Sequence, residues 1–357
     1  MDDGRPAVVV YRPSSIVAHH PGRDSMKSAQ SQVRRAAELA LLTAAIPPLA
    51  LSARFVQGRK RAEAVWEASR FPKMGDVGAV KNLTILPLID WYSVDPDVLE
   101  GESGVSYLIR ADDTTILFDL GLNKNQEHPS PLLRNMERLG VNFNEIDMIF
   151  ISHAHLDHIG GMENAREGLF APSAGYVDLH QMPAYLPTPL VNPAATPIVI
   201  EEPTVLAPGI VSMGPIPRQL FFLGWTPEQS LAIHVEGKGV VLIIGCGHPT
   251  IQKIIARKEM LFDEPLYGVI GGLHYPVTGS RSVRHGIPAQ QIFGTGLWPW
   301  QRITKADVHR AIAFLYRRDP KIVALSPHDS CDWSLAAFRT AFGQRYQDLL
   351  VGREITI

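Results

Sequence analysis

The chain has little cysteine and little excess charge, and both shortages narrow its function. Cys246 and Cys331 are the only cysteines among 357 residues, so a disulfide framework and a CxxC redox pair are excluded, and one long-range disulfide is the remaining alternative. The formal net charge of -2 provides no general attraction for nucleic acid or for an anionic membrane. We therefore expect a small-molecule partner and no nucleic acid. The length suits one large domain or two ordinary ones.

The N-terminal region differs from the rest of the chain. Residues 1–33 show no helical or strand periodicity and are predicted to be a disordered segment. Residues 34–60 are predicted to form an apolar helix, which two arginines precede as in a signal peptide or anchor. Glu38 and the Pro47-Pro48 pair interrupt it before the ~20 apolar residues of a spanning helix are reached. Two interpretations stay open: export or membrane association through residues 34–56, or a cytoplasmic protein with this helix packed on its surface.

From residue 82 onward the pattern becomes that of an α/β domain, expected to cover residues 82–357. "NLTILPLID" and "SYLIRADDTTILFDLG" predict short strands, the second pair joined by a tight turn at 111–113. "SPLLRNMERLG" (130–140) has apolar residues at helical spacing and a glycine stop, and "IDMIFI" (146–151) predicts the next strand. This alternation indicates sheets covered by helices.

A weak internal repetition runs through the domain. "LAIHVEGKGVVLIIGCG" (231–247) repeats the strand, turn, strand and glycine loop of residues 106–121. "YGVIGGLHY" (267–275) then repeats the apolar strand leading to a histidine seen at 146–155. The pattern predicts two related half-domains that face each other, each delivering polar ligands at the end of a strand.

The clearest chemical motif is "SHAHLDHIGG", which follows the predicted strand 146–151. Alternate residues of an extended segment point the same way, so His153 and His155 can reach one cation together. Asp157 and His158 follow where the chain turns and can face a second cation. Imidazole with carboxylate suits zinc, manganese or iron(II). The alternative, a polar loop of solvated histidines, explains four such residues at this spacing poorly.

This HxHxDH motif resembles the signature of the metallo-β-lactamase superfamily of binuclear metallohydrolases. The resemblance covers residues 82–357 and implies a four-layer αβ/βα sandwich with two divalent ions, zinc being expected and manganese or iron being alternatives, at the edge between two sheets. "ILFDLG" matches an early strand of the family, whose carboxylate, here Asp119, supports the metal histidines from behind. By itself Asp119 would more simply be a turn residue.

A narrower resemblance is to the dihydropterin-ribofuranosylaminobenzene phosphate synthase branch of the superfamily. "GVSYLI", "FDLG", "SHAHLDHIGG", "GCGHPTI" and "VIGGLHY" occur in the order typical of that branch, followed by a late histidine before "AFRTAFG". The branch has GCSHxGI, GGFHL and HCTG where this chain has "GCGHPTI", "GGLHY" and "HDSCDWS". An unusual insert also follows His274. These departures concern the pocket, so the identity of the substrate stays open, whereas the metal-binding motif is intact.

The resemblance also implies the remaining ligands. A third histidine completes one site of the superfamily, a bridging Asp or a Cys lies on the following strand, and a final histidine completes the second site. These places correspond to His248, Cys246 and His274, and Gly245 and Gly247 would let the backbone approach the metals. Cys246 is either a thiolate ligand or a small buried hydrophobic residue. For His274 the alternative is a strand-end histidine bonded to backbone.

Two further histidines are candidate substrate contacts. His180, in "DLHQMPAY", is otherwise a surface loop residue, whereas His328 lies in "SPHDSCDW" with Cys331, where the branch has HCTG. The insert carries residues that could cover the mouth of the site or simply form a surface loop: Arg281, Arg284, His285, Trp298 and Trp300.

We expect a binuclear metal-dependent hydrolase acting on a small phosphoester, lactone or related substrate. Two cations that share a solvent molecule lower its pKa toward neutrality and make hydroxide available as the nucleophile. Asp157 would hold the second metal and orient that nucleophile. Two alternatives on the same fold remain: a pterin-related phosphoribosyl-type synthase, and a non-catalytic metal-binding sensor.

Overall fold

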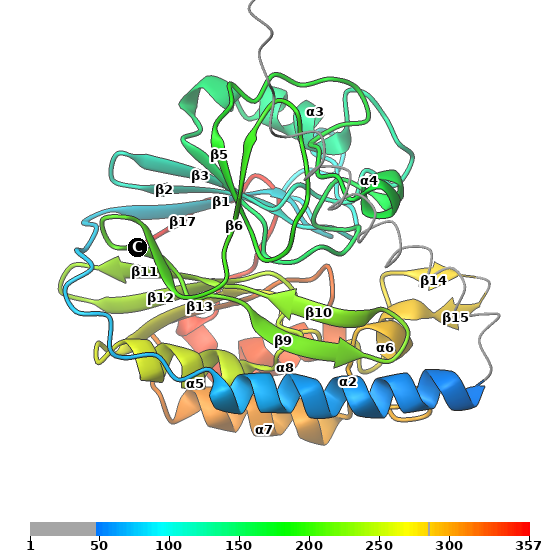
Figure 1. Cartoon of the computed structure of the whole chain (residues 1–357). Helices are drawn as coiled ribbons and strands as arrows, with labels where there is room; N and C mark the ends of the chain where they lie inside the picture. The colour runs from blue at the N-terminus through cyan, green and yellow to red at the C-terminus, as the bar shows by residue number, and fades with distance from the viewer. Residues whose placement is uncertain (1–47, 285) are drawn as a thin grey trace, which may run out of the picture.

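Short apolar runs separated by turn residues form two large β-sheets, and helices cover the outer face of each (Figure 1). The computed structural model describes residues 48–284 and 286–357. The first sheet has the strand order β17-β1-β2-β3-β4-β5-β6. Its strands are β1 (Leu83–Ile89), β2 (Ser106–Ala111), β3 (Thr114–Phe118), β4 (Met148–Phe150), β5 (Pro183–Leu186), β6 (Thr196–Val199) and β17 (Ile355–Thr356).

The second sheet has the order β16-β13-β12-β11-β8-β7. Its strands are β7 (Thr204–Ala207), β8 (Ile210–Ser212), β11 (Leu231–Val235), β12 (Gly239–Ile244), β13 (Leu266–Gly271) and β16 (Ile322–Leu325). Two small hairpins are separate, β9 (Ile216–Leu220) with β10 (Gly224–Glu228), and β14 (Val283–Arg284) with β15 (Ile287–Pro288).

The two sheets repeat one arrangement. In the first, β2 and β3 form an antiparallel hairpin, and β4 then pairs parallel to β3. In the second, β11 and β12 form the hairpin, and β13 pairs parallel to β12. Both halves therefore have the hairpin followed by a parallel strand that the repetition in the sequence predicted. The four-layer α/β fold predicted for the chain is confirmed.

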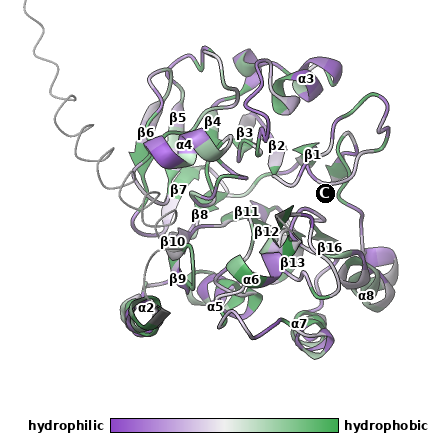
Figure 2. Ribbon diagram, turned by 90° about the vertical axis from the view of Figure 1, so that its right-hand side faces the viewer, coloured by the Kyte–Doolittle hydropathy of each residue, from purple (hydrophilic) through white to green (hydrophobic). Residues whose placement is uncertain are grey.

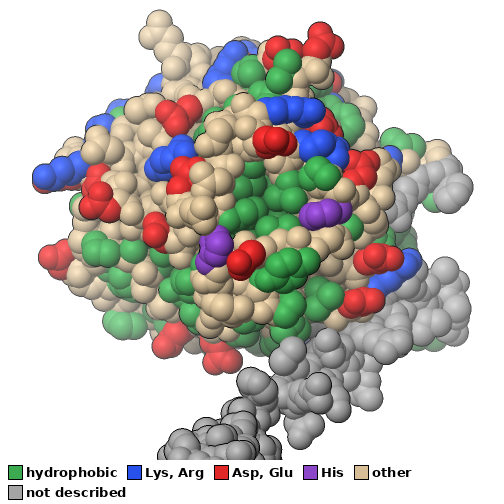
Figure 3. Space-filling view, turned by 90° about the horizontal axis from the view of Figure 1, so that it is seen from above, with side chains coloured by type: hydrophobic (Ala, Val, Ile, Leu, Met, Phe, Trp, Pro, Cys, Tyr) green, Lys and Arg blue, Asp and Glu red, His purple; other side chains and the backbone are tan. Residues whose placement is uncertain are grey.

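Three apolar layers hold the sheets and helices together. Tyr107 and Phe118 from the first sheet pack between the sheets with Ile243 and Ile270 from the second, all of them fully buried. Each buried side chain of this size contributes about 1.5–3 kcal/mol through removal of apolar surface from water. The outer layers, seen edge-on in Figure 2, lie under the helices α3 (Pro131–Arg138), α4 (Met162–Glu167), α5 (Ile251–Leu261), α7 (Lys305–Tyr316) and α8 (Asp332–Phe342). The face above the first sheet has a hollow in which hydrophobic side chains gather among charged ones (Figure 3).

Helix α2 (Pro48–Ala68) lies along the outside of the second sheet and crosses the β9–β10 hairpin (Figure 1). It buries Leu51 and Phe55 against Phe221 of the hairpin loop. The predicted helix at 34–60 is thus present from residue 48 and continues to residue 68, while the segments 1–33 and 34–47 lie outside the described residues. Within the described part of the chain, no helix combines the length and the apolar character needed to cross a membrane.

Parallel pairing brings several strand ends to one edge of the molecule. Strands β3 and β4 end together in the first sheet, and β12, β13 and β16 end together in the second. Helix α6 (Ala289–Phe293), from the insert after β13, lies at this edge (Figures 1 and 2). Polar residues that follow these strands are therefore brought face to face.

Candidate metal centre

The histidines singled out from the sequence come from both sheets and meet at the edge between them. The loop after β4 carries His153, His155, Asp157 and His158, the loops after β12 and β13 carry Cys246, His248 and His274, and the loop after β16 carries His328. Their possible ligand atoms form three overlapping groups, each with all atoms within 4.8 Å of one another. The groups are His153/His155/His248, Asp157/His158/Cys246/His328, and Cys246/His248/His274.

The first group is a cluster of three imidazoles. Nε2 of His248 lies 3.1 Å from Nδ1 of His155, and the ring of His153 stands edge-on to both. The other nitrogens of these rings are engaged: Nδ1 of His248 with the Gly294 carbonyl at 2.8 Å, and Nε2 of His155 with Thr226 Oγ1 at 3.4 Å. The Gly294 carbonyl accepts from Nδ1 of His248 and so leaves a lone pair on its Nε2, which can bind a metal or accept the Nδ1 proton of His155.

His153 follows the same pattern. Its Nδ1 lies 3.0 Å from Ser152 Oγ, and its Nε2 is buried without a hydrogen-bond partner among the described residues. Burial lowers the pKa of His153 well below its usual value and lowers that of His155 to about 3. The rings are therefore neutral at ordinary pH, which is the form that binds a metal. When a metal ion replaces the proton between Nδ1 of His155 and Nε2 of His248, both lone pairs can bind it.

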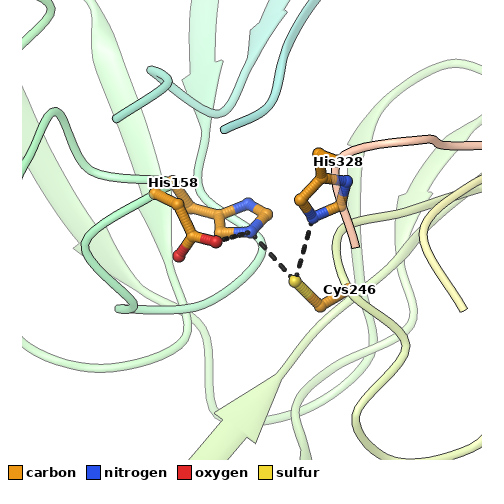
Figure 4. Close-up of side chains that lie close together, drawn as sticks. His158, Cys246 and His328 are labelled. Carbon is orange, nitrogen blue, oxygen red and sulfur yellow. Dashed lines mark hydrogen bonds and ion pairs between the residues drawn. The ribbon is translucent and has the colours of Figure 1, made fainter. Parts of the chain in front are cut away.

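The second group centres on Cys246. Its Sγ lies 3.1 Å from Nε2 of His158 and 3.2 Å from Nε2 of His328, and both rings point at the sulfur (Figure 4). A carboxylate oxygen of Asp157 lies 3.9 Å from the His158 ring. A thiol has one proton and can donate to only one of the two nitrogens. This group combines sulfur, nitrogen and oxygen donors, a set that suits zinc.

Asp119 orients the histidines of the first half. It ends β3, and its carboxylate accepts hydrogen bonds from the backbone N–H and the hydroxyl of Ser152, both at 2.7 Å. The same carboxylate lies 2.6 Å from Nδ1 of His158. Burial lowers the pKa of His158, but the carboxylates of Asp119 and Asp157 raise it to about 9. The negative field that favours a proton on this ring equally favours a metal cation beside it.

An equivalent support in the second half was missed from the sequence. Asp90, just after β1, accepts a hydrogen bond from Ser326 Oγ at 2.7 Å, and Ser326 Oγ lies 2.6 Å from Nδ1 of His328. Tyr107 also donates to Asp90 at 2.9 Å. The available signal was the pairing of "LID" at 88–90 with "LFD" at 117–119, since each places an aspartate directly after an apolar strand.

Glu228 is a second residue that the sequence did not identify. Its buried carboxylate accepts hydrogen bonds from the backbone N–H groups of Cys246, Gly247 and His248, at 3.1, 2.7 and 2.8 Å. Burial raises its pKa to about 7, even though two of these bonds favour the ionised form. Gly245 is required beside this turn because a Cβ there would collide with the Ser152 side chain. The turn that presents Cys246 and His248 is therefore held from both sides.

His274 lies in the third group with Cys246 and His248, whereas His328, predicted as a substrate contact, lies in the second group with Asp157 and His158. That His274 completes the second metal site stays a prediction. Nε2 of His274 lies 3.0 Å from the Gln290 carbonyl, and its Nδ1 is buried without a partner among the described residues. Burial lowers its pKa to about 4.

The insert after β13 forms one wall of the centre. Its carbonyls hold His248 and His274, and Gln290 donates to the His328 carbonyl at 2.6 Å. Arg281 fastens the insert by donating to the carbonyls of Pro327 and Ser330, at 3.0 and 3.1 Å.

The other insert residues singled out from the sequence lie away from these histidines. Trp298 packs edge-on against Phe55 of α2 with ring centroids 5.0 Å apart, and Trp300 stacks on Trp298 and is exposed. The Arg284 side chain and His285 lie outside the described parts of the chain.

Two predicted pocket residues lie outside the three ligand groups. His180 is exposed, and its Nδ1 lies 3.5 Å from the Asp178 carboxylate. Cys331 precedes helix α8, where its Sγ accepts hydrogen bonds from the backbone N–H and hydroxyl of Thr278, at 3.4 and 3.3 Å.

Comparison with known proteins agrees with this fold. The model of the metallo-beta-lactamase superfamily matches residues 99–221. A curated relative from Methanocaldococcus jannaschii is 27% identical over 240 residues, which span 56% of this chain and 80% of the relative. That relative is named 7,8-dihydropterin-6-methyl-4-(beta-D-ribofuranosyl)-aminobenzene-5'-phosphate synthase.

Solved structures also resemble the chain. A metal-dependent hydrolase of the beta-lactamase superfamily has a TM-score of 0.53 at 18% identity, and the match covers 77% of this chain and 99% of the other. The metallo-beta-lactamase fold protein YhfI from Bacillus subtilis has a TM-score of 0.47 at 12% identity, covering 78% of this chain and all of the other. The first of these likenesses supports the four-layer fold.

Proposed function

We propose that the chain is a member of the metallo-β-lactamase superfamily and a metal-dependent hydrolase that holds two divalent cations and acts on a small phosphoester, lactone or related substrate. One observation carries the proposal. Imidazole nitrogens of His155 and His248 face each other at 3.1 Å beside the buried, unpartnered Nε2 of His153, and all three can bind a metal in their neutral, deprotonated form. Two imidazole nitrogens bound to one tetrahedral zinc ion lie about 3.3 Å apart, given zinc–nitrogen distances of about 2.0–2.1 Å.

The two ligand groups assign a cation to each side of the centre. His153, His155 and His248 would hold the first, and Asp157, His158, Cys246 and His328 the second. Cys246 then acts as a ligand, because its sulfur stands between two histidine nitrogens that cannot both receive its proton. His274 would then line the pocket, where its unpartnered Nδ1 is available to a substrate hydroxyl or amide.

Two divalent cations in these groups would supply a nucleophile at neutral pH by lowering the pKa of water, and would stabilise negative charge on the oxygen under attack. The chain's own residues set the geometry for this chemistry. Asp119 and Ser326 keep Nε2 of His158 and of His328 directed inward, and Glu228 holds the turn that carries Cys246. Asp157 is placed to orient the nucleophile. The sulfur and nitrogen donors favour zinc, while manganese or iron remains compatible with the three histidines.

A second candidate is a pterin-related synthase that handles a phosphoribosyl-type substrate. The relative from Methanocaldococcus jannaschii carries that kind of name and matches more than half of this chain. The "GCGH" and "GGLH" elements support this candidate, whereas "HDSCDWS" in place of HCTG counts against it. Both candidates need the same ligands and differ in the substrate that turns over.

The test combines metal analysis with turnover. We expect about two divalent ions per chain after reconstitution, measured by mass spectrometry of the elements, and hydrolysis of at least one member of a panel of phosphodiesters, phosphomonoesters, lactones and thioesters. His155→Ala should abolish turnover and lose one ion, because it removes a ligand of the three-histidine group. Cys246→Ser should weaken binding of the second ion.

His309→Ala is the matched control, because His309 lies exposed on α7, away from the ligand groups. It should leave metal content and turnover unchanged. A reconstituted protein without transition metal, or His155→Ala turning over at the wild-type rate, would contradict the hydrolase. Metal binding with no turnover of the panel or of a pterin ribosyl phosphate would instead favour the non-catalytic sensor.

A further inference from the structure

Arg218 is a largely buried cation on β9 whose chemistry the metal centre does not use. Its Nε is buried and has no hydrogen-bond partner among the described residues. Burial lowers the pKa of Arg218, Arg59 lowers it further, and Glu63 raises it. A guanidinium in such a place is costly unless a ligand satisfies its donors, because it has five N–H groups and cannot lose its charge at ordinary pH.

The register of the β9–β10 hairpin places Arg218 on the face that carries site residues. Arg218 is directly opposite Thr226, and Ile216 is opposite Glu228. Directly opposed residues of an antiparallel pair share a face, and so do alternate residues of one strand. Arg218 therefore shares its face with Thr226, which contacts His155, and with Glu228, which holds the turn of Cys246 and His248.

The other face of the hairpin turns toward helix α2. A Cβ added at Gly58 of α2 would collide with Gln219, the neighbour of Arg218, and the guanidinium of Arg61 lies over the Trp225 ring. Arg59 and Glu63 also belong to this helix, so their charges act on Arg218 across the hairpin. The partner of the Arg218 guanidinium must consequently come from the side of the metal centre.

The insert approaches Arg218 from that side. Gly296 has φ +63°, and a Cβ added there would collide with the Arg218 guanidinium. Two residues earlier, the carbonyl of Gly294 accepts the hydrogen bond from His248. The segment 294–296 thus runs from the candidate metal centre to Arg218, with the backbone of Gly294 against the His274 ring and that of Gly296 against the guanidinium.

We propose that Arg218 binds an anionic oxygen group of the substrate, a phosphate or a carboxylate, placed away from the bond that is cleaved. The inference rests on the proposed function and narrows it to substrates that carry such a group. The guanidinium is planar and presents a fork of N–H donors that matches two oxygens of either anion, which an ammonium or an amide cannot reproduce.

The experiment measures anion binding to the metal-loaded protein by titration calorimetry, with inorganic phosphate in one arm and acetate in the other. We compare Arg218→Gln, which removes the charge, and Arg218→Lys, which keeps the charge without the fork. Arg61→Gln is the matched control, since Arg61 lies over the opposite face of the same hairpin. Metal content and thermal unfolding are recorded for each variant.

Arg218→Gln should weaken binding of phosphate or acetate about tenfold or more, because charge-assisted hydrogen bonds contribute ~1.5–3 kcal/mol and ~1.4 kcal/mol corresponds to tenfold. Arg218→Lys should lie between this variant and the wild type, and Arg61→Gln should match the wild type. The anion whose affinity falls in Arg218→Gln is the one that Arg218 binds.

Wild-type affinity for both anions in Arg218→Gln, with its metal retained, would overturn the assignment. A loss of affinity in Arg61→Gln as large as the loss in Arg218→Gln would overturn it as well. If Arg218→Gln does not fold, the comparison of Arg218→Lys with Arg61→Gln decides. A wild-type protein that binds no metal yet binds phosphate through Arg218 would overturn the proposed hydrolase and still support the anion site.

Discussion

The two halves of the protein orient their histidines by the same device and differ in how directly a carboxylate reaches the ring. In the first half, Asp119 contacts His158 itself at 2.6 Å and also holds Ser152. In the second half, Asp90 reaches His328 only through the hydroxyl of Ser326. In each half a serine just after a parallel strand also lies between an aspartate and a histidine, Ser152 between Asp119 and His153 and Ser326 between Asp90 and His328.

The pKa values of the two supported histidines differ in the same way. The carboxylates of the first half raise the pKa of His158 to about 9 against the effect of burial. Burial instead raises the pKa of Asp90 to about 6, and it lowers the pKa of His328 well below its usual value. The two halves thus differ in how an aspartate supports its histidine, directly at His158 and through a hydroxyl at His328, while Asp157 and Asp329 each lie 3.9 Å from the Nε2 of one of these rings.

The largest effect is expected from removing the direct carboxylate. Asp119→Asn should destabilise the fold by about 3–5 kcal/mol, because it takes a buried charge partner from His158. It should also weaken zinc binding at the second group by about 10–100-fold, the usual effect of losing a residue that orients a ligand. Urea unfolding and a zinc titration measure the two quantities.

Asp90→Asn is the matched variant in the other half and should cost less in both measurements, since a hydroxyl lies between Asp90 and His328. Equal losses of stability and of zinc affinity in the two variants would contradict the proposed difference between direct support of His158 and hydroxyl-mediated support of His328.

A smaller effect is expected from the two serines. Ser152→Ala leaves Nδ1 of His153 without its acceptor, and Ser326→Ala does the same to His328, so each should cost about 1–3 kcal/mol. In a zinc titration, Ser152→Ala should weaken the three-histidine group and Ser326→Ala the group with Cys246. If both variants weakened the same binding step, the assignment of one serine to each group would be wrong.

The smallest effect concerns the outer faces of the two sheets. The penultimate residue of β2 is Arg110, which pairs with Glu145 at 2.9 Å, while that of β11 is His234, which packs on Phe262 at 4.4 Å between ring centroids. Burial lowers the pKa of His234, Glu264 raises it and Lys258 lowers it, and the net direction is downward. The unfolded chain then binds the proton more readily, so the free energy of unfolding should fall as pH drops below about 6.5.

His234→Asn should remove this part of the acid destabilisation, which amounts to about 1 kcal/mol or less between pH 7 and pH 5. Denaturant unfolding at the two pH values measures it. Arg110→Gln should show no such change over that interval: burial raises the pKa of Glu145, but the hydrogen bond from Arg110 outweighs it and the net direction is downward, away from this interval. A pH dependence that is identical in the wild type and in His234→Asn would assign the effect to other groups.

Local patterns in the sequence were enough for the elements and for much of the site. The strand signals at 106–118 and 231–244, the helix signal at 130–140 and the HxHxDH spacing depend on residues close together in the chain, and the structure has elements at those places. The position of Asp119 at the end of β3, where it supports Ser152 and His158, agrees with the role that the family resemblance implied.

The grouping of His274 and His328 could not be predicted in this way. Both follow parallel strands of the second sheet, so both reach the same edge, and spacing along the chain does not say which one faces Cys246 and His158. The register of the β9–β10 hairpin likewise decides that Glu228 and Arg218 face the site, because a shift by one residue would turn both away.

By itself the sequence determined the α/β fold, the repeated halves and most of the candidate metal ligands, because periodicity and ligand spacing are local properties. Only the tertiary structure decided how those side chains divide between two groups and which residues support them. Asp90 and Ser326, and Glu228 with the turn of Cys246, meet only after the sheets have packed. The physical reason is that a metal centre depends on distances of about 2–3 Å between atoms from different strands, and close packing of the sheets sets those distances.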